Sequence, residues 1–229
     1  MLGRPSWKLA PICRFLVHTD SAQCFDTLAS DDRWRTFTAE EQLKVEVFIR
    51  RWGIKPGDRV LEPGCGSGRL TAVLADLTGP TGRVAAFDCS PEFLRLAAQR
   101  DLPQHVTLQA AWAEALPLAP ESFDHVVCFN VFPHLVPQKI IACRLAAALR
   151  PGGLFWIAHT CSRAFVNAVH RSGPPGMRDH ILPAPRVLAR LLRESGLKEV
   201  EIEDGADHFL ARAVRPRSEP PVSNVARSF

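Results

Sequence analysis

Apolar residues along the chain follow two patterns that together predict a buried sheet covered by amphipathic helices. Short, nearly continuous apolar runs are typical of strands buried on both faces of a parallel sheet. The clearest run is 123–129, which is apolar at almost every position after His125. We expect seven strands from such runs. One begins at Val60, a second ends at Asp88, and the other five cover 106–110, 123–129, 154–158, 200–203 and 208–214.

Apolar positions three or four residues apart predict the helices between these strands. Thr38 and Glu41 form the T-x-x-E pattern of a capping box, which predicts a helix start, and Gly53 predicts the end of that helix. Its expected apolar stripe is Leu43, Val47 and Phe48. Four further helices are expected. The first runs from about Gly68 to Leu77, and the second begins after the cap Ser90-Pro91. The third has the apolar stripe Ile140, Ile141, Leu145 and Leu149, and the fourth runs from Pro185 to Ser195 with the stripe Val187, Leu188, Leu191 and Leu192.

Residues 160–184 interrupt this alternation, and we expect an irregular insert there. Asn167 and His170 are three residues apart, so a helical turn would place both on one face. Asp-Gly-Ala-Asp at 204–207 predicts a turn between the last two strands, which would then form a hairpin. From Arg215 the chain is rich in Pro and Ser, which predicts a disordered tail over 215–229.

Composition is that of an ordinary globular domain and excludes several function classes. The 229 residues are 46% apolar and 23% charged, which suits one α/β domain with its own core. The net charge of +4 is mild and dispersed, so we expect no nucleic-acid footprint. Seven cysteines without a C-x-x-C pair indicate reduced thiols and a cytoplasmic protein, and we expect neither a signal peptide nor a membrane span.

The most informative segment is Val-Leu-Glu-Pro-Gly-Cys-Gly-Ser-Gly-Arg-Leu at 60–70. Glycines at 64, 66 and 68 allow the backbone to approach a ligand closely, because no side chain fills the space. Asp88 ends the next strand, where nucleotide-binding folds place the acid that accepts hydrogen bonds from ribose hydroxyls. The segment therefore predicts a nucleotide-like ligand at the carboxyl ends of these strands.

The glycine spacing E-P-G-x-G-x-G differs from the G-x-G-x-x-G of NAD sites and resembles motif I of the class I S-adenosylmethionine-dependent methyltransferases. The resemblance covers about Phe25 to Val214. Four more segments match in order: 85–94, 112–118, 122–130 and 149–157. It implies a Rossmann-like fold, with a seven-stranded, mostly parallel sheet, a C-terminal antiparallel hairpin and helices on both faces.

The core is most similar to small-molecule methyltransferases of the ubiquinone and menaquinone type. This resemblance implies methyl transfer from S-adenosylmethionine to a small acceptor, with S-adenosylhomocysteine as product. It also divides the chain into an N-terminal cap segment (1–37), a methyltransferase domain (38–214) and the tail (215–229). The segment from Phe25 to Ala29, with Trp34, resembles the part of those enzymes that covers cofactor and substrate, and it can equally be a packing helix.

Carried over position by position, the resemblance also implies a cofactor site. Asp88 would hold the ribose, and Asn130 would stand where the methyl group emerges. The residues that would frame the methionine part are Glu62, Gly64, Cys65, Gly66 and Gly68, and those beside the adenine are Cys89, Ser90, Ala113 and Glu114. One departure is Trp112, where family members often carry an Asp that accepts from the adenine amino group, because an indole cannot accept that bond.

Histidines are frequent at the expected carboxyl edge of the sheet and leave three interpretations open. His134 or His159 is the candidate for a general base or substrate orienter, since imidazole titrates near neutral pH. The alternatives are ordinary polar loop residues, or a metal site that also uses His170 and His180, although their spacing is not that of a metal motif. A base is not obligatory, because the sulfonium methyl group is already activated and needs mainly an in-line nucleophile.

Three other functions compete with a small-molecule methyltransferase. The first is a cofactor-binding protein or partner subunit without catalysis, which the departure at Trp112 keeps open. The second is an RNA or protein methyltransferase, but Asn130-Val131-Phe132-Pro133 is not the [N/D]-P-P-[Y/F] signature of base and amide methylation. The third is a dehydrogenase, which the glycine spacing disfavours. The sequence leaves the acceptor and the oligomeric state open.

Overall fold

A seven-stranded sheet forms the centre of the protein in the computed structural model, which describes residues 19–217. Its strand order is β3-β2-β1-β4-β5-β7-β6, in which β1 to β5 run parallel and β7 and β6 are antiparallel additions. The strands are β1 (Arg59–Pro63), β2 (Arg83–Asp88), β3 (Val106–Ala110), β4 (Phe123–Phe129), β5 (Leu149–His159), β6 (Lys198–Asp204) and β7 (Phe209–Val214). The predicted fold class, with its C-terminal hairpin, is confirmed.

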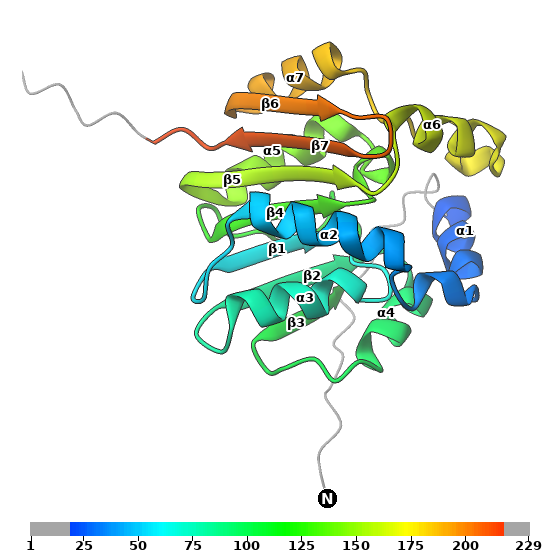
Figure 1. Ribbon diagram of the computed structural model, residues 1–229, viewed down its shortest axis with the longest axis horizontal. Coiled ribbons are helices and arrows are strands. Elements are labelled where there is room, and N and C mark those ends of the chain that lie inside the picture. Colours follow the sequence, from blue (N-terminus) through cyan, green and yellow to red (C-terminus); the bar gives the residue numbers. More distant parts are fainter. Residues whose placement is uncertain (1–18, 218–229) are drawn as a thin grey trace, which may run out of the picture.

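Helices cover both faces of the sheet (Figure 1). The α-helices are α1 (Thr19–Ala29), α2 (Ala39–Trp52), α3 (Arg69–Thr78), α4 (Pro91–Ala98), α5 (Gln138–Ala148), α6 (Arg163–Ser172) and α7 (Pro185–Glu194). The described residues also form three 3₁₀ turns: η1 (Asp32–Trp34), η2 (Phe132–His134) and η3 (Pro175–Met177). In the part of the chain that the structure describes, none of these helices has the length and apolar character to cross a membrane.

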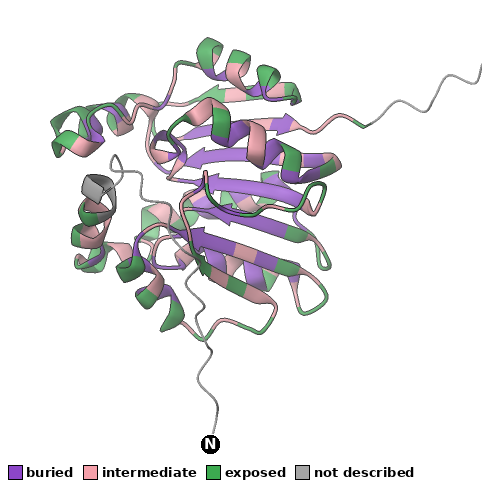
Figure 2. Cartoon of the chain, turned by 180° about the vertical axis from the view of Figure 1, so that it is seen from behind, coloured by how far each residue is buried: buried purple, intermediate pink, exposed green. Residues whose placement is uncertain are grey.

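Two apolar clusters, one on each face, hold these layers together. Alternate residues of β1 point to opposite faces, so Val60 packs with α2 and α3, whereas Leu61 packs with α5 and α7. The central strands are buried almost along their whole length, and the edge strands β3 and β6 are more exposed (Figure 2). This burial explains the continuous apolar run at 123–129.

The apolar stripes of three helices differ in part from the prediction. In α2 the capping box of Thr38 and Glu41 and the left-handed Gly53 are present as expected. The buried positions are Val45, Phe48 and Trp52, however, and the predicted Leu43 and Val47 are 64% and 44% exposed. Ile140 in α5 and Val187 in α7 also face outward. In each helix, the residues that pack on the sheet are spaced three or four positions apart, as expected. The first of them, however, lies one or two residues after the first residue that we predicted to be buried.

The expected irregular insert at 160–184 was also wrong, because α6 and η3 occupy most of it. The predicted strand at 154–158 starts earlier, at Leu149, and the pairing of β4 with β5 shifts register between Phe123 and His125. Of the predicted 215–229 tail, 218–229 lie outside the described residues, as do 1–18 of the predicted N-terminal cap segment.

The topology places a crevice where β1 and β4 are neighbours, because the connections that follow these two parallel strands lead to opposite sides of the sheet. Helices α1 and α6 both lie beyond the carboxyl ends of the strands (Figure 1). Helix α1 contacts α4 and η3 there. Ligands of open α/β sheets bind at such a switch point, so this edge is where a site is expected.

Candidate functional site

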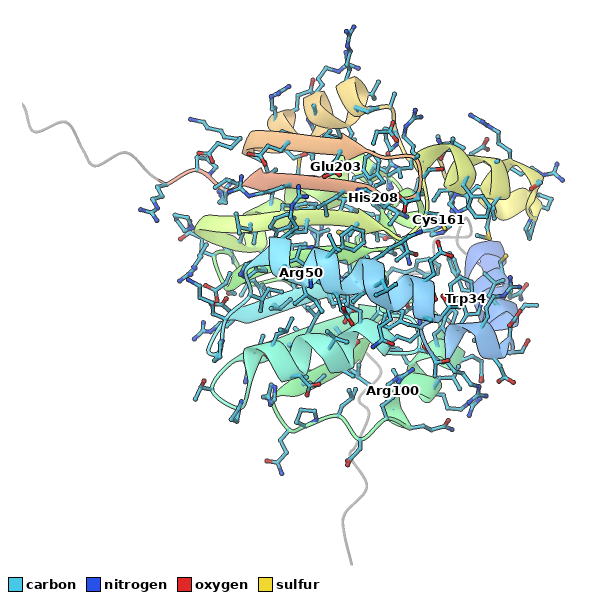
Figure 3. All side chains as sticks on the ribbon, in the orientation of Figure 1. Trp34, Arg50, Arg100, Cys161, Glu203 and His208 are labelled. Atoms are coloured by element: carbon cyan, nitrogen blue, oxygen red, sulfur yellow. The ribbon has the colours of Figure 1, made fainter. Side chains whose placement is uncertain are left out.

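A cavity of about 480 Å³ opens at this edge, and its lining joins the two candidate regions found in the sequence. That volume lies within the range of roughly 300–1,000 Å³ that small-molecule sites occupy. One part of the wall is formed by the glycine loop after β1 and the ends of β2 and β3, and another by η2, α6 and η3. Trp34 and Cys161, which both line the cavity, lie at the end of the molecule that carries α1 and α6 (Figure 3).

The glycine loop is held by the carboxylate of Asp88. The N–H of Gly66 donates to Oδ2 of Asp88 at 2.8 Å, and the N–H of Ser90 donates to Oδ1 at 2.9 Å. Burial raises the pKa of Asp88, and these backbone donors act in the opposite direction. Gly64 has φ of +64°, and a Cβ there would stand 2.2 Å from Cγ2 of Val131. The loop therefore forms a backbone-lined cradle that a side chain would obstruct.

Glu62, at the end of β1, is the second buried carboxylate of this region. It is 2% exposed and lines the cavity, and its Oε2 accepts a hydrogen bond from Oγ1 of Thr71 at 2.6 Å. Burial, reinforced by the nearby Asp88 charge, raises the pKa of Glu62 to about 8 against the effect of Thr71. A cationic group that entered the cavity beside Glu62 and Asp88 would favour their ionised forms.

The side chain of Asn130 links the end of β4 to the end of β5 by hydrogen bonds. Its φ is +53°, a left-handed conformation that Asn adopts more readily than most residues. Its Oδ1 accepts from the N–H of Thr160 at 3.0 Å, and its Nδ2 donates to Oγ1 of Thr160 at 3.3 Å. Both residues line the cavity.

Four histidines from separate segments line the cavity, and we call them the histidine group: His134, His159, His170 and His180. Nδ1 of His134 and Nδ1 of His180 are 3.0 Å apart, and the ring centroids of His134 and His170 are 4.6 Å apart. Desolvation lowers the pKa of His134 well below its ordinary value, with help from the other three rings. His159 is also buried, and its pKa is lowered to about 3.

The structure distinguishes the two candidate bases. Nε2 of His159 is buried and has no hydrogen-bond partner among the described residues, whereas Nδ1 of His134 is paired with His180. Within 19–217, no three His, Cys, Asp or Glu side chains are arranged so that they could hold a metal ion. The six cysteines in this range are free thiols. The two imidazoles therefore differ in their surroundings, because Nδ1 of His134 has a ring nitrogen as its partner and Nε2 of His159 has none among the described residues.

Comparison with known proteins assigns the chain to a family. A family described as a methyltransferase domain matches residues 60–153. The ubiquinone biosynthesis O-methyltransferase of Burkholderia pseudomallei (strain 1710b) is 32% identical over 170 residues, which cover 69% of this chain and 72% of that protein. The chain belongs to the class I S-adenosylmethionine-dependent methyltransferases. The predicted family and enzyme class are confirmed.

Solved structures share the fold of this methyltransferase at low sequence identity. An S-adenosylmethionine-dependent methyltransferase from Aquifex aeolicus has a TM-score of 0.63 at 20% identity, covering 84% of this chain and 97% of that one. Phosphoethanolamine N-methyltransferase 2 of Haemonchus contortus, in complex with S-adenosyl-L-methionine, has a TM-score of 0.70 at 19% identity, covering 90% and 61%. These matches concern the architecture alone.

Most of the predicted site residues of the methyltransferase line the cavity, and Gly68 and Ser90 are the exceptions. Gly68 allows α3 to pack closely on α4, because a Cβ there would be 3.1 Å from Cβ of Ala97. The hydroxyl of Ser90 accepts from the N–H of Phe93 as the cap of α4 and donates to Asp26 at 2.5 Å. Both residues therefore support the helices beside the cavity, and Ser90 also links α1 to α4.

On the side of β2 and β3, the cavity wall contains Cys89, Trp112, Ala113 and Glu114 together. Trp112 therefore belongs to the wall in which the sequence placed Ala113 and Glu114. Burial raises the pKa of the Cys89 thiol, so this thiol stays protonated at neutral pH.

Sequence reasoning missed several wall residues of the methyltransferase. Thr160 follows His159 at the end of β5, and the carboxyl-edge rule that selected Asn130 applies to it equally. Arg69 is the first residue of α3, and its guanidinium donates to the carbonyl of Thr36 at 3.0 Å and stands 4.6 Å above the ring of Phe37. No sequence pattern indicated that Met177 in η3 lines the cavity, because its position depends on a contact with Cys24 of α1, in which the two sulfur atoms are 3.2 Å apart.

Proposed function

We propose that this methyltransferase transfers the methyl group of S-adenosylmethionine to a hydroxyl group of a small, largely apolar molecule. The observation that carries this proposal is that one cavity has the glycine loop and Asp88 at one part of its wall and the histidine group at another. An acceptor and a cofactor can meet in such a space without an extended polymer surface.

The residues around the glycine loop fit the cofactor. S-adenosylmethionine supplies a methyl carbon activated by the sulfonium charge, and its sulfur keeps the electron pair when the carbon–sulfur bond breaks. Asp88 would accept hydrogen bonds from the ribose hydroxyls, and Glu62 with the backbone at 64–66 would face the methionine part. Cys89, Ala113 and Glu114 would border the adenine. Burial of two carboxylates beside the loop suits a ligand that carries positive charge.

The rest of the cavity fits an acceptor with apolar surface. Phe25, Leu28, Leu135, Val166 and Met177 contribute to its wall. Apolar walls with a few convergent polar groups are typical of small-molecule sites. The Burkholderia relative is named for O-methylation in ubiquinone biosynthesis, which supports an oxygen acceptor here. His134 would accept the proton of the hydroxyl, or orient it, beside Asn130.

The same proposal gives the N-terminal cap segment a position at the cavity. Helix α1 belongs to the N-terminal cap segment (1–37), and its Phe25 meets the ring of His134 edge-on at 5.1 Å between centroids. Both earlier interpretations of this segment are compatible with that contact, since α1 packs on α4 and also closes one side of the cavity.

Calorimetric titration with S-adenosylmethionine and S-adenosylhomocysteine tests the cofactor site. Binding in the micromolar range by the wild type, and a loss of roughly tenfold or more in Asp88→Ala, is expected because one charge-assisted hydrogen bond contributes about 1.5–3 kcal/mol. Asp76→Ala, an exposed carboxylate on α3, is the matched control and should bind like the wild type. Wild-type binding that Asp88→Ala retains would contradict the assigned site.

A labelled-methyl experiment tests the acceptor. The wild type is incubated with cell extract and S-adenosylmethionine that carries a labelled methyl group, and the extract is then separated by size. We expect the label in the small-molecule fraction, on oxygen. Label recovered in RNA or protein would overturn the proposed acceptor class and favour the macromolecular alternative.

A further inference from the structure

The contact between His134 and His180 constrains where protons can be. Their Nδ1 atoms are 3.0 Å apart, and two neutral imidazoles bond in this way only when one Nδ1 carries the proton and the other offers its lone pair. The pair therefore shares one proton across the contact. When Nδ1 of His134 carries the shared proton, Nε2 of this ring has the free lone pair, and the side chain lines the cavity.

Helix α6 holds His180 in this position through its inward face. Nδ1 of His170 contacts the carbonyl oxygen of His180, so this nitrogen must be the protonated one. Asn167, one turn earlier, bonds both backbone groups of Leu182: its Nδ2 donates to the carbonyl at 3.0 Å and its Oδ1 accepts from the N–H at 2.8 Å. The N–H of His180 also donates to the carbonyl of Met177 at 3.0 Å. These contacts fix the backbone on both sides of the His180 side chain.

The surroundings make a proton on His134 alone unfavourable. Desolvation is the main cause that lowers its pKa, and the rings of His170, His180 and His159 add to it. The pKa of His180 is lowered by desolvation and by His170, but the carboxylate of Asp179 acts in the opposite direction. A proton is thus better accommodated on His180 than on His134.

We propose that His134 and His180 form a proton relay for the methyl acceptor. This inference rests on the proposed function. The acceptor oxygen gives its proton to Nε2 of His134 as it forms its bond to the methyl carbon. His134 then passes its Nδ1 proton to the lone pair on Nδ1 of His180, and His180 releases the proton on its Nε2 to water. His134 and His180 each return to a neutral imidazole with exchanged tautomers, and one proton has moved from the acceptor to solvent.

The relay also narrows the acceptor class. An acceptor that must lose a proton, such as a phenol or catechol, uses the relay, whereas a tertiary amine has no proton to give. His180 acts through His134, so it is a positioning and proton-accepting partner and need not touch the acceptor. Molecules that carry a hydroxyl group are therefore the acceptors that the histidine group suits.

Nitrogen NMR tests the shared proton without any turnover. Protein labelled with ¹⁵N at histidine, in complex with S-adenosylhomocysteine, should show a nitrogen–nitrogen coupling between the two Nδ1 atoms, and this coupling should vanish in His180→Phe. The two rings should also titrate together, taking up one proton between them. His105→Gln, a histidine outside the cavity lining, is the control and should leave both signals unchanged. Independent titration of His134 and His180 without the coupling would overturn the relay.

Turnover tests the function of the pair, with 4-methylcatechol or the hydroxyl acceptor isolated from extract as probe. We expect His180→Ala to lower kcat about tenfold or more, to leave the affinity for S-adenosylmethionine unchanged, and to regain part of the rate when imidazole is added. Wild-type turnover in His180→Ala, or a loss that imidazole does not relieve, would overturn the relay alone. A wild type that binds the cofactor and methylates no hydroxyl would overturn the proposed function and the relay with it.

Discussion

At the scale of single residues, the tightest constraint in the site is the contact between Gly64 and Val131. A Cβ at Gly64 would be 2.2 Å from Cγ2 of Val131, and φ is +64°. Gly53 has the same φ of +64°, but an added Cβ would meet nothing within 4 Å. The two glycines therefore separate the cost of a left-handed backbone from the cost of steric overlap.

We predict that Gly64→Ala lowers the free energy of unfolding by more than Gly53→Ala does. Gly53→Ala should cost about 1–2 kcal/mol through backbone conformation alone, and Gly64→Ala at least about 1 kcal/mol more. Thermal and denaturant unfolding measure both. In the Gly64→Ala background, Val131→Ala should restore part of the additional loss. Equal losses for the two glycine variants would show that the loop yields without cost.

Single residues were also where the sequence predicted the site best. The carboxylate of Asp88 and the amide of Asn130 stand at strand ends, and a strand end is readable from the apolar run before it. The sequence could not separate His134 from His159, because the difference depends on a partner 46 residues away, at His180. Ser90 was assigned to the ligand, although its hydroxyl is used by the cap of α4 and by Asp26.

At the scale of elements, α6 is the least predictable part of the fold because its polarity is inverted. Its buried residues are the polar Asn167 and His170, whereas Phe165 and Val169 are 58% and 49% exposed. Apolar periodicity assumes that the inward face is apolar, so it gave no helix that packs on the core. The polar face is inward because it bonds the backbone of 180–182.

We expect Asn167→Ala to loosen the segment that carries His180. The substitution removes both hydrogen bonds to Leu182 and leaves two buried backbone groups unpaired, so the free energy of unfolding should fall by about 2–4 kcal/mol. Hydrogen exchange at the amide of Leu182 should become faster, which mass spectrometry of this segment measures.

Ser172→Ala, on the exposed side of the same helix, is the matched control for this prediction. Its hydroxyl bonds only carbonyls of its own helix, so stability and exchange should stay close to the wild type. Unchanged exchange at Leu182 in Asn167→Ala would mean that the remaining contacts of the segment, which include those of His170 and Gln138, are enough to hold it.

At the scale of the whole molecule, buried imidazoles give stability a characteristic dependence on pH. Burial lowers the folded-state pKa of His159 to about 3, whereas an unfolded chain has a pKa of about 6.5. As pH falls through this window, the unfolded chain binds the proton first, so stability is lost below about pH 6.5 and down to about pH 3. Glu62 acts in the opposite direction, because its raised folded-state pKa makes the folded chain bind its proton more tightly.

We predict that His159→Phe flattens the acid side of the stability curve. Between pH 7 and pH 5 the wild type should lose about 2 kcal/mol more than the variant, since each pH unit inside the window corresponds to about 1.4 kcal/mol. Denaturant unfolding at several pH values gives the slope, which does not depend on how well phenylalanine packs. Parallel curves for His159→Phe and the wild type would refute a buried neutral His159.

The fold class was predictable from the sequence, but α6 and the arrangement across the cavity were not. The apolar runs gave the strands, and the resemblance to class I methyltransferases implied the mostly parallel sheet with its C-terminal hairpin, whereas the strand order comes from the structure. The approach of α1 to η3 depends on Cys24 meeting Met177, 153 residues away in the chain. Such a contact leaves no periodic signal, because neither residue forms part of a repeating pattern.

The contact of Gly64 with Val131 has a consequence for anyone who engineers a new acceptor specificity. Val131 begins the loop that leads to His134, so a library that remodels this loop for another substrate also shifts the support beneath the glycine loop. Selection for a new product alone would then enrich variants whose affinity for the methyl donor has drifted. Libraries that keep Val131 fixed and vary the exposed side of α6 leave the donor site intact while the acceptor side evolves.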